Sequence, residues 1–154
     1  CARRPPSFKL SEEVVLVNGN ETQPESGCGH RHLTAAGAFW SLPCTLVGFV
    51  FALLSGALPH RNDGILVAHS TRGLAHLALA KRGFVAITLG RIVVTVVPFT
   101  AALRMHEEHH VWQYGRLGPL FFPAYLYRHF TCGYGDNPFE RDAERCAQLF
   151  TGRQ

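Results

Sequence analysis

The stretch Arg104-Met-His-Glu-Glu-His-His-Val-Trp-Gln113 carries the strongest structural and chemical signal in this sequence. If the stretch is helical, His106 and His110 lie four residues apart on one face, and Glu107 follows the first of them. This is the pattern H-E-x-x-H, in which two imidazoles bind a metal ion and a carboxylate takes a proton from water that the metal activates. The stretch therefore predicts a helix that bears a metal site.

Three fixed positions in five residues also occur by chance, and the chain contains nine histidines. The alternative interpretation is a polar helix face with solvated histidine and glutamate side chains. A second segment, Gly135-Asp-Asn-Pro-Phe-Glu140, favours the metal site. Asp136 or Asn137 can cap a helix, the proline suits a first helical turn, and Glu140 projects from that turn. A catalytic zinc ion takes three protein ligands and keeps one position open, and two histidines with one glutamate supply that number.

The combination of His106-Glu-x-x-His110, Glu140 and Ala143 resembles the gluzincin branch of zinc metallopeptidases. More narrowly, about residues 42–147 resemble an uncharacterised family of bacterial membrane-associated proteins. The motifs that carry this resemblance are Ala86-Ile-Thr-Leu-Gly90, His110-Val-x-Gln-Tyr114, Gly118-Pro-Leu-Phe-x-Pro-Ala-Tyr125 and Asn137-Pro-Phe-Glu-x-x-Ala143. The resemblance implies His106, His110 and Glu140 as ligands of Zn²⁺, but it implies no substrate.

Peptidase versions of the motif usually have uncharged residues at the two inner positions, where this chain has Glu108 and His109. Both side chains would have to face water or a partner across the helix, and His109 could compete with His106 as a ligand. Two functions are therefore considered. The first is a peptidase-like zinc hydrolase with Glu107 as general base, acting on a peptide or protein. The alternative is a non-catalytic, membrane-associated metal-binding or interaction protein.

Further polar residues surround the predicted site in sequence. Gln113 lies three residues after His110, so it could line the site or orient a ligand. A hydrolase also needs a donor that stabilises the oxyanion, and several side chains are eligible for that role: Tyr114, Arg128, His129 and Tyr134.

Residues 33–60 form the second informative segment. No charged side chain occurs from Leu33 to Pro59, and Phe39–Leu58 is apolar over a length that spans a bilayer's hydrocarbon core of about 30 Å. The segment predicts one hydrophobic helix that crosses a membrane or lies on its surface. The alternative is a helix packed under the folded domain. The first interpretation predicts association with a membrane, the inner membrane if the source is bacterial.

The N-terminal residues 1–32 are rich in Pro, Gly, Asn and Ser, and they predict a disordered tail. The chain is mildly basic, with a net charge of +4. Lysines and arginines are scattered without a basic run, which argues against a nucleic-acid partner. The same basic balance suits the surface of an anionic membrane.

Four segments between residues 64 and 97 have strand-like composition, and they are Gly64–His69, Leu74–Ala80, Gly83–Leu89 and Arg91–Val97. The short turns between them predict an antiparallel hairpin or meander. By resemblance to zincin folds, Val85–Leu89 is expected beside the metal-binding helix, where it could pair with an extended peptide. His69 and His76 lie on these predicted strands and are interpreted as structural or exposed side chains.

The predicted fold class is α+β. A zincin-like minidomain is expected over residues 61–154, with a small antiparallel sheet, an H-E-x-x-H helix at Thr100–Gly115 and a C-terminal helix at Pro138–Phe150 that carries Glu140. One N-terminal hydrophobic helix is expected to precede it. A chain of 154 residues is long enough for a single core.

Overall fold

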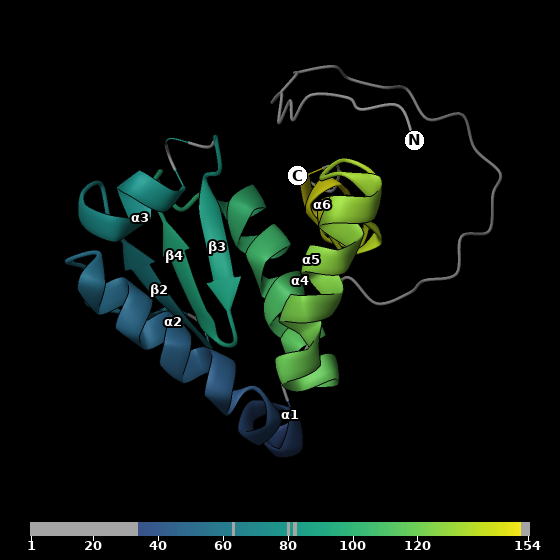
Figure 1. The fold of residues 1–154 in the computed structure, drawn as a ribbon, viewed down its shortest axis with the longest axis horizontal. Helices are drawn as coiled ribbons and strands as arrows, with labels where there is room; N and C mark the ends of the chain where they lie inside the picture. The colour runs from purple at the N-terminus through teal and green to yellow at the C-terminus, as the bar shows by residue number, and fades with distance from the viewer. Residues whose placement is uncertain (1–33, 63, 80, 82, 152–154) are drawn as a thin grey trace, which may run out of the picture.

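The computed structural model describes residues 34–62, 64–79, 81 and 83–151 (Figure 1). Helices surround one small sheet, so the predicted α+β class is confirmed. The predicted tail at residues 1–32 lies outside the described residues. The elements in chain order are α1 (Ala35–Trp40), α2 (Leu42–Leu54), β1 (His60–Asn62), β2 (Ile65–His69), α3 (Gly73–Ala78), β3 (Ala86–Leu89), β4 (Ile92–Thr95), α4 (Ala101–Leu117), η2 (Gly118–Leu120), α5 (Phe121–Cys132) and α6 (Pro138–Thr151).

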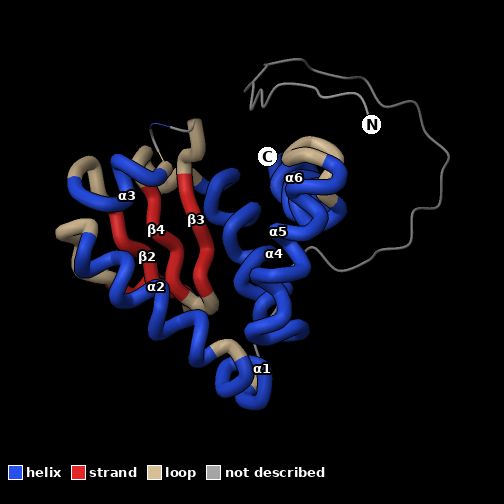
Figure 2. Tube along the Cα trace, viewed as in Figure 1, coloured by secondary structure: helices blue, strands red, loops and turns tan. Residues whose placement is uncertain are grey.

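The four strands form a mixed sheet in the order β1-β2-β4-β3. β1 pairs antiparallel with β2, and β3 pairs antiparallel with β4. The two central strands, β2 and β4, are parallel, with Val67 opposite Val93. The predicted antiparallel sheet is therefore wrong in its centre. β3 occupies one edge of the sheet, next to α4 (Figure 2).

The error arises from Leu74–Ala80, because most of this segment belongs to helix α3 rather than to a strand. Its alternation of leucine and alanine resembles a strand, but the buried positions are Ala75 and Leu79, which have the spacing of a helix face. The N–H of Ala75 donates to Ser55 Oγ at 2.9 Å, which ties the start of α3 to the end of α2. Parallel strands need a crossover connection, and α3 lies within the one that joins β2 to β4.

Helices cover both faces of the sheet. Because successive strand residues point to opposite faces, the buried side chains divide into two clusters. One cluster joins the sheet to α2 and α3 through Ala52, Ala57, Ala68, Ala75, Leu79, Ile92 and Val94. The other joins the sheet to α4 through Ile65, Val67, Val93 and Val111. Helix α2 and helix α4 therefore lie on opposite faces of the sheet.

The apolar segment at residues 33–60 contains two helices, α1 and α2, which meet at the buried Ser41. Helix α2 has 13 residues, and Pro43 occupies its first turn, where a proline is tolerated. Its Gly48 packs against the sheet so closely that a Cβ there would lie 2.9 Å from Leu89 Cβ. Among the described residues, no helix has the length and apolar character needed to cross a membrane. The predicted single N-terminal hydrophobic helix is therefore not supported.

The two helices predicted for the site are present, and their capping residues explain where they start. Helix α4 begins after Thr100, whose Oγ1 accepts from the N–H of Leu103 at 3.3 Å. Helix α6 begins after Asn137, whose Oδ1 accepts from the N–H of Phe139 at 3.1 Å. The two helices pack against each other, and Ala143 is fully buried on α6, which allows close approach.

Candidate metal centre

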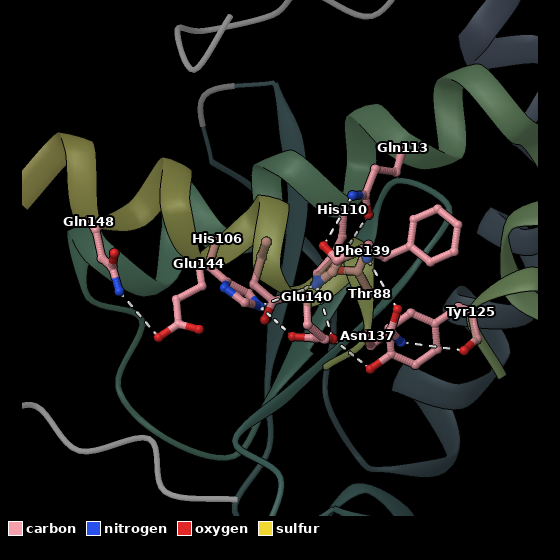
Figure 3. Close-up of polar contacts among 11 residues, drawn as sticks. Thr88, His106, His110, Gln113, Tyr125, Asn137, Phe139, Glu140, Glu144 and Gln148 are labelled. Carbon is pink, nitrogen blue, oxygen red and sulfur yellow. Dashed lines mark hydrogen bonds and ion pairs between the residues drawn. The ribbon is translucent and has the colours of Figure 1, made fainter. Parts of the chain in front are cut away.

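The two motif histidines converge as the helical spacing predicts. His106 and His110 lie one turn apart on α4, and their Nε2 atoms are 3.2 Å apart. Glu140 enters from the first turn of α6, with Oε2 3.3 Å from His106 Nε2 and Oε1 3.5 Å from His110 Nε2 (Figure 3). One ligand atom from each of the three residues lies within 4.8 Å of the others. Among the described residues, this is the group of histidine, cysteine and carboxylate side chains suited to hold a metal ion.

The donor set fits a divalent cation. Two imidazole nitrogens and a carboxylate are ligands that zinc accepts. Glu140 Oε2 is buried without a hydrogen bond, although it lies 3.3 Å from His106 Nε2, and His106 Nδ1 is likewise buried without a hydrogen-bond partner among the described residues. Burying a carboxylate oxygen without a donor is costly unless a cation compensates its charge. A metal ion between the three ligand atoms would supply that compensation.

The charges at the site are mutually dependent. Burial by itself raises the pKa of the Glu140 carboxyl, but its interactions with His106 and His110 outweigh this and hold the pKa well below its usual range. Burial lowers the pKa of His110, whereas Glu140 and Glu107 raise it, and the net result is a raised pKa. The group therefore favours an anionic carboxylate next to positive charge, which either a protonated imidazole or a metal ion can provide.

Gln113 orients one of the ligands. Its Oε1 lies 2.8 Å from His110 Nδ1, and its Nε2 donates to the carbonyl oxygen of Phe139 at 3.2 Å. Since the amide oxygen can only accept, His110 Nδ1 carries a proton, and Nε2 is the ring nitrogen that faces the site. Of the two roles considered for Gln113 from the sequence, the structure places it in the orienting one, where it also links α4 to α6.

Glu107 is buried beside the ligands and is held by the sheet. Thr88, on the edge strand β3, donates from Oγ1 to Glu107 Oε2 at 2.5 Å. This contact fixes one carboxylate oxygen, and it places the edge strand directly against the candidate base. Sequence reasoning had not singled out Thr88, because it lies 19 residues before Glu107 and only the tertiary packing joins them.

A second residue that the sequence did not single out is Tyr125. It lies on α5, and its hydroxyl donates to Glu140 Oε1 at 2.5 Å. Burial, and then the negative charge of Glu140, raise the pKa of this phenol, so it stays protonated as a donor at neutral pH. The aromatic, proline-punctuated segment at residues 118–127 was the available signal, but its composition alone could not tell a ligand contact from ordinary packing.

The four residues considered as oxyanion donors have different surroundings. Tyr134 interacts with the Glu140 carboxylate, and burial followed by this charge raises its pKa. His129 stacks on Tyr125 with a ring-centroid distance of 6.2 Å. Tyr114 is fully buried and packs on Phe121 at 4.4 Å, away from the ligand group. The remaining candidate, Arg128, is exposed, and its guanidinium lies 6.0 Å from the ring centre of Tyr127.

The two charged or polar inner residues of the motif have other partners. Arg104 donates from Nε to Glu108 Oε1 at 2.7 Å, one turn away on α4. His109 Nδ1 lies 3.3 Å from Cys146 Sγ on α6. His109 is therefore not brought into the ligand group, and it does not compete with His106.

The remaining histidines considered from the sequence, His69 and His76, are exposed and lie outside the ligand group. The site thus consists of three converging candidate ligands, a buried carboxylate at Glu107 and three orienting contacts from Thr88, Gln113 and Tyr125. In comparisons with known proteins, no family, no curated protein and no solved structure matches this chain.

Proposed function

We propose that this chain is a zinc-dependent hydrolase of the peptidase type. The observation that carries the proposal is the convergence of His106, His110 and Glu140, with the carboxylate of Glu107 buried beside them. Zinc is the proposed metal because two imidazoles with one carboxylate form a nitrogen-rich set, whereas calcium and magnesium prefer oxygen ligands. The resemblance of the motifs to gluzincins agrees with this assignment.

When bound, the zinc ion supplies Lewis acidity, which makes a water molecule a nucleophile at neutral pH and polarises a carbonyl. Glu107 is proposed to act as general base. Its Oε2 is held by Thr88, so Oε1 is the oxygen that takes the proton from the attacking water and passes it to the leaving amine. Gln113 and Tyr125 keep the ligands oriented and take no part in proton transfer.

The proposed substrate is an extended peptide that pairs with β3. This strand lies at an edge of the sheet, with β4 on one side, and an edge strand can add another extended chain through main-chain hydrogen bonds. The contact between Thr88 and Glu107 brings this edge and the candidate base together. A peptide paired with Ala86–Leu89 would therefore run beside the metal ligands.

One observation favours a non-catalytic, metal-binding role as the second candidate. Glu107, His110 and Glu140 are each at most 6% exposed. Structural zinc sites are closed, whereas catalytic sites keep one position open to water and substrate. In this alternative the ion would hold α4 and α6 together without turnover.

The Glu107→Gln variant separates the two functions. The amide keeps the size of the side chain but cannot take up the proton, so cleavage of a fluorogenic peptide library should fall about 10²–10⁴-fold. Zinc content, measured by mass spectrometry of the metal, should stay at the wild-type value. The matched control is Glu108→Gln, which changes the neighbouring carboxylate on the same helix and should preserve turnover, because Glu108 bonds to Arg104.

Three results are informative. Cleavage lost in Glu107→Gln and kept in Glu108→Gln supports the hydrolase. Zinc-dependent cleavage that survives in Glu107→Gln contradicts the proposed base. A wild-type protein that is fully loaded with zinc and cleaves no member of the library would establish the non-catalytic alternative.

A further inference from the structure

Large apolar side chains are concentrated among the exposed residues of the first three helices. Of the eighteen large hydrophobic residues that are exposed in the described part of the chain, ten lie between residues 39 and 58 and two more on α3. We call these side chains the apolar face, and its members are Phe39, Trp40, Leu42, Leu46, Val47, Phe49, Val50, Leu53, Leu54, Leu58, Leu74 and Leu77. Contiguous apolar surfaces of this kind usually mark a docking site.

The apolar face results from the way α2 packs. The helix meets the sheet through its small residues, Gly48 and Ala52, which are its buried positions. Of its large side chains, Phe51 packs against the core, whereas most of the others are exposed. A helix whose only role was to cover the sheet would be expected to place its large apolar residues inward and polar residues outward. Here the opposite distribution leaves the large residues available for another partner.

Arginines lie at both ends of α2. At its start, the backbone N–H of Arg91 donates to Thr45 Oγ1 at 3.1 Å, while the Arg91 guanidinium donates to the carbonyl oxygen of Gly64 at 3.0 Å. At its end, Ser70 Oγ donates to the carbonyl oxygens of Ser55 and Arg72, at 2.6 and 2.7 Å, so the exposed Arg72 adjoins the helix terminus.

Two further arginines adjoin the rest of the apolar face. Arg61 is exposed on β1, three residues after Leu58. Arg116 is exposed at the end of α4, beside α1, where a Cβ on Gly37 would lie 2.9 Å from the carbonyl oxygen of Gly115. Arg61, Arg72, Arg91 and Arg116 thus belong to backbone segments that lie next to elements of the apolar face.

Acidic residues are nearly missing from this half of the sequence. Between residues 34 and 106 the only acidic residue is Asp63, whereas the basic residues are Arg61, Arg72, Lys81, Arg82, Arg91 and Arg104. An apolar surface with a cationic border is complementary to an anionic bilayer, which offers hydrocarbon in the middle and phosphates at the rim. A symmetric dimer through the same face would instead bring two arginine borders together without acidic partners.

We propose that the apolar face docks the protein peripherally on an anionic lipid surface, with the apolar side chains of α1, α2 and α3 in the interface. This deepens the expectation of membrane association by naming the surface and its orientation, and it does not depend on the proposed hydrolase activity. Because α2 and α4 lie on opposite faces of the sheet, the docked protein would hold its metal centre on the side away from the bilayer.

The test is flotation of the full chain with vesicles. We expect the protein to float with vesicles of phosphatidylcholine and phosphatidylglycerol, and less with phosphatidylcholine alone. The double variant Leu46→Glu/Val50→Glu should lower the partition coefficient at least about tenfold, because two apolar side chains are replaced by anions. The matched control is Leu149→Glu on α6, since its side chain is 50% exposed, close to the 65% and 54% of Leu46 and Val50. This control should float like the wild type.

The contribution of the arginines next to the apolar face is tested separately. Arg61→Gln and Arg72→Gln should each weaken binding to the anionic vesicles about fivefold, with no effect on phosphatidylcholine vesicles. If the glutamates unfold the protein, as seen by circular dichroism, the milder pair Leu46→Ser/Val50→Ser applies the same test. The proposal is overturned if the wild type does not float, or if the folded double variant floats unchanged. It is equally overturned if sedimentation shows a dimer that the double variant dissociates and no vesicle binding occurs.

Discussion

At the scale of single residues, the candidate site depends on contacts that orient two of its three candidate ligands, His110 and Glu140. Gln113 leaves His110 Nε2 as the ring nitrogen that faces the site, and Tyr125 donates to one oxygen of Glu140 while the other accepts no hydrogen bond. Thr88 holds one carboxylate oxygen of Glu107, the candidate base, by donating a hydrogen bond to it. Orienting partners of this kind typically contribute 10–100-fold to metal affinity or activity.

The ligand assignment gives a prediction for metal content. Wild-type protein should bind about one zinc ion, and His106→Ala or His110→Ala should lose it, because each removes one of three protein ligands. Glu140→Gln should weaken zinc binding, since a neutral amide is a poorer ligand than a carboxylate. Metal analysis after dialysis measures all three variants.

The control for this prediction is His129→Ala. His129 is near the site and stacks on Tyr125, but it is not in the ligand group. Zinc should be retained in this variant. Full zinc occupancy in both His106→Ala and His110→Ala would disprove the site.

At the scale of elements, the turn between β3 and β4 joins the edge strand to helix α2. Gly90 forms this turn with φ +66, and a Cβ at that position would collide with Thr45 of α2. The same helix residue bonds to Arg91. The turn, the edge strand and α2 are therefore packed as one unit, and the position of Thr88 beside Glu107 depends on it.

Gly90→Ala should consequently lower the free energy of unfolding more than a glycine change elsewhere. The matched control is Gly64→Ala, because Gly64 also has positive φ, +96, but a Cβ there meets no atom within 4 Å. In this control, the free energy of unfolding should fall only by the backbone strain, on the order of 1–2 kcal/mol. Gly90→Ala should cost a further 1–3 kcal/mol or so for overpacking. Urea denaturation of both variants checks the difference, and equal losses would contradict the packing described.

At the scale of the whole molecule, the metal centre connects parts of the chain that the sheet does not. Its candidate ligands come from α4 and α6, and its orienting contacts come from β3, α4 and α5. Metal binding should therefore add to global stability, and because zinc competes with protons for the same ligands, the gain should depend on pH.

The sign follows from the two pKa shifts. The lowered pKa of Glu140 contributes stability above the usual carboxyl value of 4.5, and this is lost as the pH falls through the lowered pKa. The raised pKa of His110 contributes stability that is complete below the usual value of 6.5 and is lost as the pH rises through the raised pKa. In the metal-free protein, the stability that Glu140 and His110 contribute should thus be greatest between about pH 4.5 and 6.5.

Zinc replaces the proton on His110, so the zinc-bound form escapes the loss at higher pH. The difference in melting temperature between protein with zinc and protein with chelator should widen from pH 5 to pH 8, reaching at least about 5 °C at pH 8 with saturating zinc. Thermal melts at both pH values test this. A difference that is constant over the range would show that zinc does not bind at His110.

Local patterns in the sequence were enough to predict the α+β class, the helices that carry the candidate ligands and a cap at Asp136 or Asn137, of which the structure selects Asn137. These features follow from spacings of three or four residues and from side chains that bond to nearby backbone, so they can be read without knowing the fold. The pair His106 and His110 was visible for the same reason, whereas Glu140 was assigned from the ligand number of zinc and from the resemblance to gluzincins. The membrane interpretation of residues 33–60 came from composition and stays a prediction, now expressed as a surface on α1, α2 and α3.

Other features arose only when distant segments packed. Leu74–Ala80 has a strand-like alternation, yet it is mostly helical because Ala75 and Leu79 fit against α2 and the sheet. The parallel pairing of β2 with β4 and the contacts of Thr88 and Tyr125 all join residues far apart in the chain. The physical reason is that helix caps and helix faces depend on near neighbours, whereas strand partners, burial and orienting hydrogen bonds depend on what the rest of the chain brings into contact.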